Sequence, residues 1–432
     1  GAARRRANRA RSPEGSVEAD EWRDDAVVAP LGPSLLTRVL AFGFGVACLI
    51  HLRLNPRQAL PTVKTARDLE DMRVAGEMAA RVIEHLEGVI GPGVTTGEID
   101  AAAAAFIRDE LHGASAAPLH YGGVTGGALW QLGAPGEALC ASAHLASHAL
   151  RVALGLVAAV LGARLPPALL PALCGFPASV CISVNDVVCH GVPRAHQALR
   201  AGDLVNVDVT VTSTRHGGAH GDSSKCWLIA GPLLDTVSPG DEAAEVALVA
   251  ETTRATGAAG GRRAALALAA RAALFKGIAT AHPGVTLGEV CAAVEAEASR
   301  RGFASVTAFR GHGIGRRFHE PPFLVHAAPR RDDDKATRAA AATVLRPGMV
   351  ITLEPMLNAG GPEVIVGVDG WTVRTADGSD SAQWEHTVAI GDTVAGTRVR
   401  AGGDGGVSGS RDHEGPAVEV LTRRKGEVVK SQ

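Results

Sequence analysis

The 432-residue chain is long enough for one large domain or two of ordinary size, and its 46% hydrophobic residues suffice for a sizeable core. Its 43 Lys and Arg nearly balance 45 Asp and Glu, and a net charge of −2 excludes overall attraction to nucleic acid or acidic membranes. The seven cysteines are odd in number and form no CxxC pair, which argues against a disulfide framework and a cysteine-based zinc site.

The first 60 residues read as a basic and apolar extension. Residues 1–13 carry five arginines and no acid, a composition typical of a transit peptide for a chloroplast or mitochondrion. A disordered basic tail on a cytoplasmic protein has the same composition, so the sequence leaves both alternatives open. The apolar run 39–52 is shorter than the roughly 18 to 20 residues of a spanning helix, and His51 interrupts it. We therefore expect no membrane anchor.

Two amphipathic helices open the predicted domain, which spans residues 61–423. Apolar residues recur with a helical period from Thr65 to Ile90, which predicts the first helix. A Pro-Gly turn precedes the second helix, for which we expect Thr96 as the N-cap with Glu98 close by.

Residues 124–174 differ from their surroundings because they are rich in Ala, Leu and Gly and contain few charges. We interpret them as an insertion. It is either a true loop, tolerated because the entropy of loop closure grows slowly with length, or translated intron sequence. Near the C-terminus we expect a Gly-rich loop at 396–415 and, after the domain, a tail at 424–432.

Beyond residue 176 the pattern changes to the alternation of strands. In LVNVDVTVTS, residues 204–213, valines occupy one face and polar residues the other, which predicts a half-buried strand. Helical patterns follow at 241–276, broken by TGAAGG, and at 287–301, before strands resume in MVITLEPML and AQWEHTVAI. Helices and strands in separate runs predict an α+β fold.

Five ionisable side chains lie on or beside otherwise apolar strands or in a Gly-rich turn: Asp208, Asp222, His312, Glu354 and Glu385. A Gly-Gly turn returns the chain after Asp208, so that Asp222 comes back toward it. Four converging carboxylates repel one another and are costly to bury, and two divalent cations would balance them. Carboxylates with one imidazole suit Mn, Fe, Co or Zn, and two such ions support hydrolysis.

The segments that contain these residues resemble, in order, the signature segments of type I methionine aminopeptidases. They are ASVCISVNDVVCHGVP, GDLVNVDVTV, HGDSSKCW, GHGIGRRFHE, PGMVITLEPMLNAG and SAQWEHTVAI. The resemblance covers residues 61–422 apart from insertions. It implies the pseudo-symmetric α+β pita-bread fold and a metalloaminopeptidase with two divalent cations. Such an enzyme removes the N-terminal methionine of nascent polypeptides, at the ribosome or free, and prefers a small second residue.

The resemblance also implies a role for each candidate residue. Asp208, Asp222, His312, Glu354 and Glu385 would be the metal ligands, with Asp222 and Glu385 bridging two ions and Glu354 also serving as a proton shuttle.

Seven further residues would contact the substrate. His190 and His319 would hydrogen-bond the peptide near the scissile bond. An apolar pocket for the methionine side chain would be built from Tyr121, Phe176, Cys181, Phe318 and Trp371, although such residues are also ordinary core.

Four other interpretations compete with this one. A peptidase that cleaves before proline would share the five ligands, but VCHGVP and VCISVND favour the methionine enzyme. A catalytically impaired binding protein of the same fold would be expected to lack a ligand, whereas all five are present. The Gly clusters lack the Lys-Ser/Thr of a P-loop, and no basic patch with interleaved aromatics indicates nucleic acid. We expect a monomer.

Overall fold

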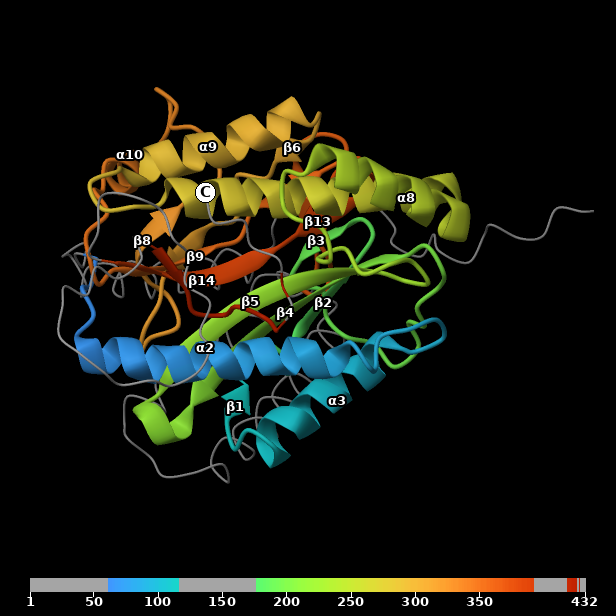
Figure 1. The fold of residues 1–432 in the computed structure, drawn as a ribbon, viewed down its shortest axis with the longest axis horizontal. Coiled ribbons are helices and arrows are strands. Elements are labelled where there is room, and N and C mark those ends of the chain that lie inside the picture. The colour runs from blue at the N-terminus through green and yellow to red at the C-terminus, as the bar shows by residue number, and fades with distance from the viewer. Residues whose placement is uncertain (1–60, 116–175, 392–417, 426, 428–432) are drawn as a thin grey trace, which may run out of the picture. The chain divides into compact units, whose positions relative to one another are not determined.

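The computed structural model describes most of the predicted domain (Figure 1), namely residues 61–115, 176–391, 418–425 and 427. Every described residue belongs to one compact unit. No described helix combines the length and the apolar character that crossing a membrane requires.

Several predicted segments lie outside the described residues. They are the extension at 1–60, the insertion at 124–174 with the neighbouring Tyr121, and the Gly-rich loop at 396–415. Their predictions remain predictions.

The described chain opens with two helices, α2 (Ala66–Leu86) and α3 (Thr96–Asp109), as the apolar periodicity predicts. Each begins at a capping box, in which a threonine side chain and an acidic side chain three residues later each accept the other residue's backbone N–H.

The predicted cap at Thr96 is wrong by one residue. Thr95 is the N-cap of α3, because the reciprocal bonds require a spacing of three residues to Glu98. The Thr96 hydroxyl instead accepts the backbone N–H of Arg194 at 2.8 Å and so ties the helix to the chain beyond the first strands.

The described strands form one large sheet and two small ones. The large sheet has the order β1 (Ala114–Ser115), β4 (Leu204–Ser213), β5 (Ala219–Leu228), β14 (Glu385–Ile390), β9 (Val350–Leu353), β7 (Gly311–Gly313) and β8 (Glu320–Leu324), with β2 (Cys181–Val184) also on β4 and β15 (Val418–Val420) on β14. The small sheets are β13 (Ser381–Gln383), β10 (Met356–Asn358) and β6 (Ala304–Ser305), and β11 (Val364–Val366), β12 (Val373–Thr375) and β3 (Val187–Cys189).

The later helices are α8 (Glu242–Thr280), α9 (Leu287–Arg300) and the short α10 (Lys335–Ala341). The predicted break in the first of them is confirmed: Gly257, inside TGAAGG, has a φ of 80° and kinks α8, a conformation that glycine adopts without steric cost.

Two helix pairs, α2 with α3 and α8 with α9, pack on the large sheet, and its strands run between the two pairs in Figure 1. The first pair packs on the valines of β4, and the second pair packs on Ile351, Leu353 and Trp384. Because side chains alternate along a strand, the residues between these apolar ones point to the opposite face. The polar residues of the signature segments therefore gather on the face that the helices leave open.

Strand β4 differs from its prediction, because its polar side chains are buried as well as its valines. Only Asp208 is half-buried, and the other nine residues of the strand are buried. Both faces of the strand are therefore covered by other parts of the chain. The alternation in the sequence distinguishes an apolar buried face from a polar buried face, not a buried face from an exposed one.

The contact between α2 and β5 requires glycine at residue 221. A Cβ on Gly221 would lie 2.1 Å from the carbonyl oxygen of Ala75 in α2. Replacing Gly221→Ala should lower the free energy of unfolding by about 1–3 kcal/mol, because the helix must move off the strand.

The control is Gly91→Ala, where an added Cβ meets nothing within 4 Å. Thermal unfolding followed by circular dichroism should show a clear loss for the first variant and little change for the second. Equal midpoints for the two variants would contradict this account of the contact.

Candidate metal centre

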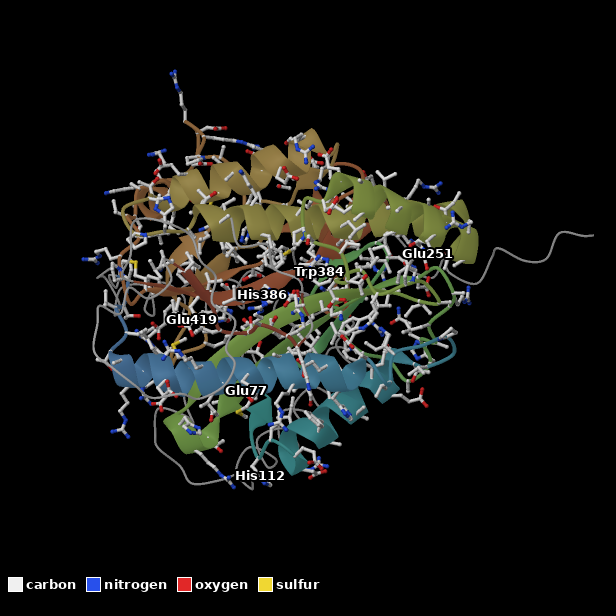
Figure 2. All side chains as sticks on the ribbon, in the orientation of Figure 1. Glu77, His112, Glu251, Trp384, His386 and Glu419 are labelled. Carbon is white, nitrogen blue, oxygen red and sulfur yellow. The ribbon has the colours of Figure 1, made fainter. Side chains whose placement is uncertain are left out.

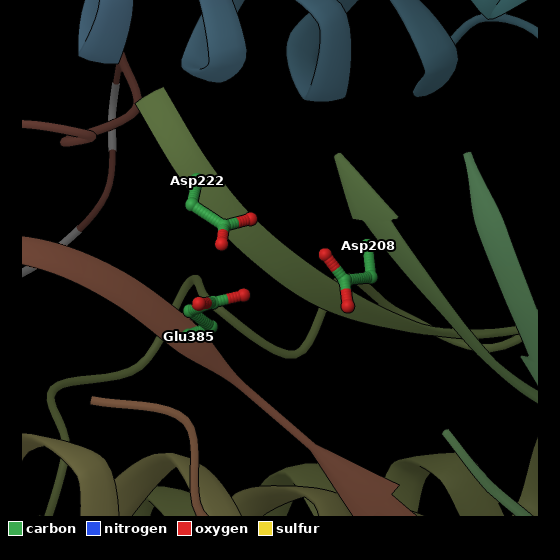
Figure 3. Close-up of side chains that lie close together, drawn as sticks. All are labelled: Asp208, Asp222 and Glu385. Atoms are coloured by element: carbon green, nitrogen blue, oxygen red, sulfur yellow. The ribbon is translucent and has the colours of Figure 1, made fainter. Parts of the chain in front are cut away.

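Three neighbouring strands bring carboxylates to the open face of the sheet. Asp208 of β4 lies opposite Ser224 of β5, and Ser224 lies opposite Glu385 of β14. Directly opposed residues on antiparallel strands point to the same face, and Asp222 shares it because it lies two residues from Ser224. Figure 3 shows Asp208, Asp222 and Glu385 pointing toward one another. Their ligand oxygens all lie within 4.8 Å of one another.

Strands β9 and β7 add the other two predicted ligands. Thr352 of β9 lies opposite Thr387 of β14, so Glu354, two residues further along, emerges on the same face. The Nε2 atom of His312 lies 3.7 Å from an Asp222 oxygen and 3.9 Å from a Glu354 oxygen. The structure thus brings all five predicted ligands together from five segments of the chain.

The four carboxylates are electrostatically unfavourable as they stand. Burial raises the pKa of Asp208 to about 7. Burial and then the charge of Asp208 raise the pKa of Asp222 well above its usual value, and burial followed by the charge of Asp222 does the same to Glu354 and Glu385. In the part of the chain that the structure describes, no lysine or arginine is among the charges that act on them.

His312 is oriented as a metal ligand requires. Its Nδ1–H donates to the carbonyl oxygen of Gly313 at 2.9 Å, which leaves the lone pair of Nε2 directed at the carboxylates. Burial lowers the pKa of His312 to about 4, so the imidazole is neutral near pH 7. The backbone N–H of His312 donates to the hydroxyl of Thr352 at 2.9 Å and fixes the turn.

The residues present fit divalent cations. Glu385 Oε1 is buried and has no hydrogen-bond partner among the described residues, and neither does the hydroxyl of Ser224, which lies between Asp208 and Glu385. Oxygen donors with one imidazole are the ligand set of Mn, Fe, Co or Zn rather than of a soft, thiolate-bound metal. A cation would offset the burial that raises the pKa values of all four carboxylates and the repulsion that adds to it at Asp222, Glu354 and Glu385.

Sequence reasoning missed several groups that hold the ligands in place. The hydroxyl of Thr210 donates to Asp222 at 2.8 Å, and the hydroxyl of Thr352 donates to Glu354 at 2.9 Å. Both threonines lie two residues from a ligand, a spacing that could have identified them. The backbone N–H of Glu354 donates to Nε2 of the buried His326 at 3.0 Å, and no local pattern indicates that contact.

The two predicted substrate histidines lie in different surroundings. His319 is exposed, and its ring centroid lies 4.3 Å from that of His312, directly beside the metal ligands. His190 is half-buried, has a φ of 53°, and packs edge-on against Phe309 at 5.2 Å. Burial lowers the pKa of His190 to about 4. Their roles toward a substrate stay predictions.

Three of the predicted pocket residues form one buried cluster. Phe176 and Trp371 meet edge to face at 5.4 Å, and Cys181 packs with them. Cys181 lies opposite Asp208 on β2, so the cluster adjoins the ligands. Phe318 belongs to another cluster with Met72 and Ile314, while Tyr121 lies outside the described residues.

Comparisons with known proteins agree with this geometry. The profile of Metallopeptidase family M24 matches residues 171–392, which contain all five ligands, so the chain is a metallopeptidase of that family. Methionine aminopeptidase of Escherichia coli K12 is 34% identical over 331 residues, covering 77% of this chain and 90% of that protein. Methionine aminopeptidase A of Synechocystis is 32% identical over 329 residues, covering 76% and 93%.

A solved structure of a methionine aminopeptidase also resembles this chain. The crystal structure of methionine aminopeptidase from Rickettsia prowazekii superposes with a TM-score of 0.55 at 26% identity, covering 84% of this chain and all of that one. The fold is therefore the pita-bread fold, as predicted. Within family M24, the chain belongs to the methionine aminopeptidases.

The raised carboxylate pKa values predict that metal binding displaces protons. Groups such as Asp208, with a pKa of about 7, hold protons in acid and must release them to coordinate a cation. The affinity of the metal-free protein for Mn²⁺ or Co²⁺ should therefore rise from about pH 6 to about pH 8. Calorimetric titration in buffers of different ionisation enthalpy measures both the affinity and the protons released. An affinity that is independent of pH, with no proton release, would count against this site.

Proposed function

We propose that this chain binds two divalent cations and removes the N-terminal methionine of polypeptides that carry a small second residue. The observation that most supports this proposal is that five predicted ligands converge on one face of the sheet: Asp208, Asp222, His312, Glu354 and Glu385. The relatives named as methionine aminopeptidases support the substrate class, and four carboxylates support a pair of cations by charge balance.

Bound cations would supply a polarised carbonyl and an activated water at this centre. Glu354 is the proton carrier of the proposal. It is half-buried at the edge of the cluster, and the Thr352 hydroxyl, which donates to its Oε1, fixes the carboxyl group. From that position it would accept a proton from water and return it to the departing amine.

His319 and His190 would recognise the peptide by hydrogen bonds. His319 is exposed next to His312, so a peptide that reaches the ligands passes its imidazole. A donor there would stabilise the negative charge that develops on the scissile carbonyl oxygen. His190 directly follows β3, which pairs with β12, and β12 begins two residues after Trp371 of the pocket cluster.

The cluster of Phe176, Cys181 and Trp371 is the proposed seat of the methionine side chain. Aromatic and sulfur groups contact a thioether favourably, and the cluster adjoins Asp208 through Cys181. A free N-terminal amine would then lie near the carboxylates, which provide the negative charge to hold it.

The first test is methionine release from Met-Ala-Ser and Met-Leu-Ser peptides by metal-depleted protein, with and without Co²⁺ or Mn²⁺. We expect release only with metal, and faster release from Met-Ala-Ser. Two metals bound per chain without any release would overturn the proposed activity and favour a binding protein of the same fold.

A second test separates recognition from metal binding. Replacing His319→Ala should lower kcat about 10²-fold or more, because a donor to the developing oxyanion is lost, while the metal content stays at the wild-type value. The control is His85→Ala on α2, an exposed histidine stacked on Phe106 on the outer side of the fold. Steady-state kinetics with metal analysis measures both. Loss of metal in the His319 variant would instead make this residue a ligand.

A further inference from the structure

A second buried polar cluster lies behind the metal centre, on the helix-covered face of the sheet. Ser223 of β5 and His386 of β14 lie opposite each other, and they alternate with the ligands Asp222 and Glu385. The segment after β15 reaches them, so Arg424 and Glu427, predicted to belong to a tail, are 2% and 4% exposed. Figure 2 places His386 and Trp384 centrally, between α2 and α8.

Arg424 links β5, which carries Asp222, to β14, which carries Glu385. Its Nη1 donates to the hydroxyl of Ser223 at 3.1 Å and to the carbonyl oxygen of Ser224 at 3.4 Å. The Ser223 hydroxyl in turn donates to the backbone carbonyl oxygen of Glu385 at 2.8 Å. One guanidinium group is thus linked to the residue after Asp222 and, through a single hydroxyl, to Glu385.

Glu427 and Thr422 hold this bridge in place. Arg424 Nη2 donates to Glu427 Oε1 at 2.6 Å, and the guanidinium lies over the ring of Trp384 at 5.6 Å. His386 contacts the Thr422 hydroxyl through Nδ1 at 2.9 Å and Glu427 through Nε2 at 3.3 Å. The same hydroxyl accepts the backbone N–H of Thr387 at 3.1 Å.

The position of this cluster matters because the junction that it spans is short. Strands β4 and β5 pair over ten residues, whereas β5 and β14 pair only at Ser224 with Glu385 and at Ser223 with His386. That junction sets the separation of Asp222 from Glu385. A short ladder can slide or open unless other bonds hold it. The Thr387 hydroxyl of β14 spans it, accepting the backbone N–H of Asp222 at 3.3 Å and donating to the carbonyl oxygen of Asp222 at 2.8 Å. Arg424 adds contacts to both strands, at Ser223 and Ser224 of β5 and, at 3.4 Å, at His386 Nε2 of β14.

We propose that Arg424, held by Glu427, is a positioning residue for the metal centre: it locks the junction of β5 and β14 and so fixes Asp222 relative to Glu385. The inference rests on the proposed function for its catalytic consequence only, because metal affinity reports it directly. A buried ion pair adds little net stability over an apolar pair of similar size, so the retention of two buried charges here favours a role in geometry.

The test replaces both charges by apolar side chains, Arg424→Met with Glu427→Leu, because removing one partner alone leaves a buried unpaired charge and risks unfolding. We expect the double variant to fold, with Co²⁺ affinity about tenfold weaker or more, an altered visible spectrum of bound Co²⁺, and a lower kcat at little-changed KM. The milder Ser223→Ala, which removes the bridging hydroxyl, should change the same quantities less.

The matched control is the largely buried ion pair between Arg301 and Glu245, which joins α8 to the end of α9 and contacts none of the five proposed ligands. Arg301→Met with Glu245→Leu should leave the Co²⁺ spectrum and affinity as in the wild type. The positioning role would be overturned if both the Arg424/Glu427 double variant and the Ser223 variant kept the Co²⁺ affinity, the Co²⁺ spectrum and the kcat of the wild type.

The two proposals fail in different ways. If the wild type itself releases no methionine, the proposed function falls, while the Co²⁺ titrations and spectra of the same variants still decide whether Arg424 positions the ligands. If the wild type is active and the spectra of the variants do not change, only the positioning role falls.

Discussion

Mutual repulsion among four carboxylates on one buried sheet face is the constraint around which this molecule is arranged. Burial raises the pKa values of Asp208, Asp222, Glu354 and Glu385, and neighbouring charge raises those of the last three further, so the apo site favours protons and the charged site requires cations. The repulsion must be overcome by the rest of the fold, because no described basic side chain relieves it. Metal binding is then the natural way to remove the electrostatic cost, and the same charge makes the centre suitable for hydrolysis.

The fold meets this constraint by dividing the ligands between two halves. One half, with α2 and α3 on its outer side, supplies Asp208 and Asp222, and the other, with α8 and α9, supplies His312, Glu354 and Glu385. Each half has its own apolar core and can hold its ligands rigidly. Their relative position depends on the few pairs between β5 and β14, which is where the buried ion pair of the C-terminal segment lies.

Much of the candidate site could be predicted from the sequence, and the reason is local. Alternation along single strands placed Asp208 and Glu354 on the polar side, and glycines at 311, 313 and 315 marked the close approach around His312. The supporting contacts are different in kind. His326 accepts the backbone N–H of Glu354 across a separation of 28 residues, and Arg424 reaches Ser223 across 201. No spacing within one segment encodes such pairs.

By itself, the sequence determined the helices and the break at Gly257, the main strands, and which side chains carry the chemistry, because short-range periodicity and residue type contain that information. It misjudged the surroundings of β4, and no pattern in it indicated that Arg424 and Glu427 are buried. Only the tertiary structure decided that the polar face of β4 is buried, that Phe318 packs apart from Phe176 and Trp371, and that Arg424 lies behind the ligands. Burial is a property of what other segments cover, and that depends on contacts between residues far apart in the chain.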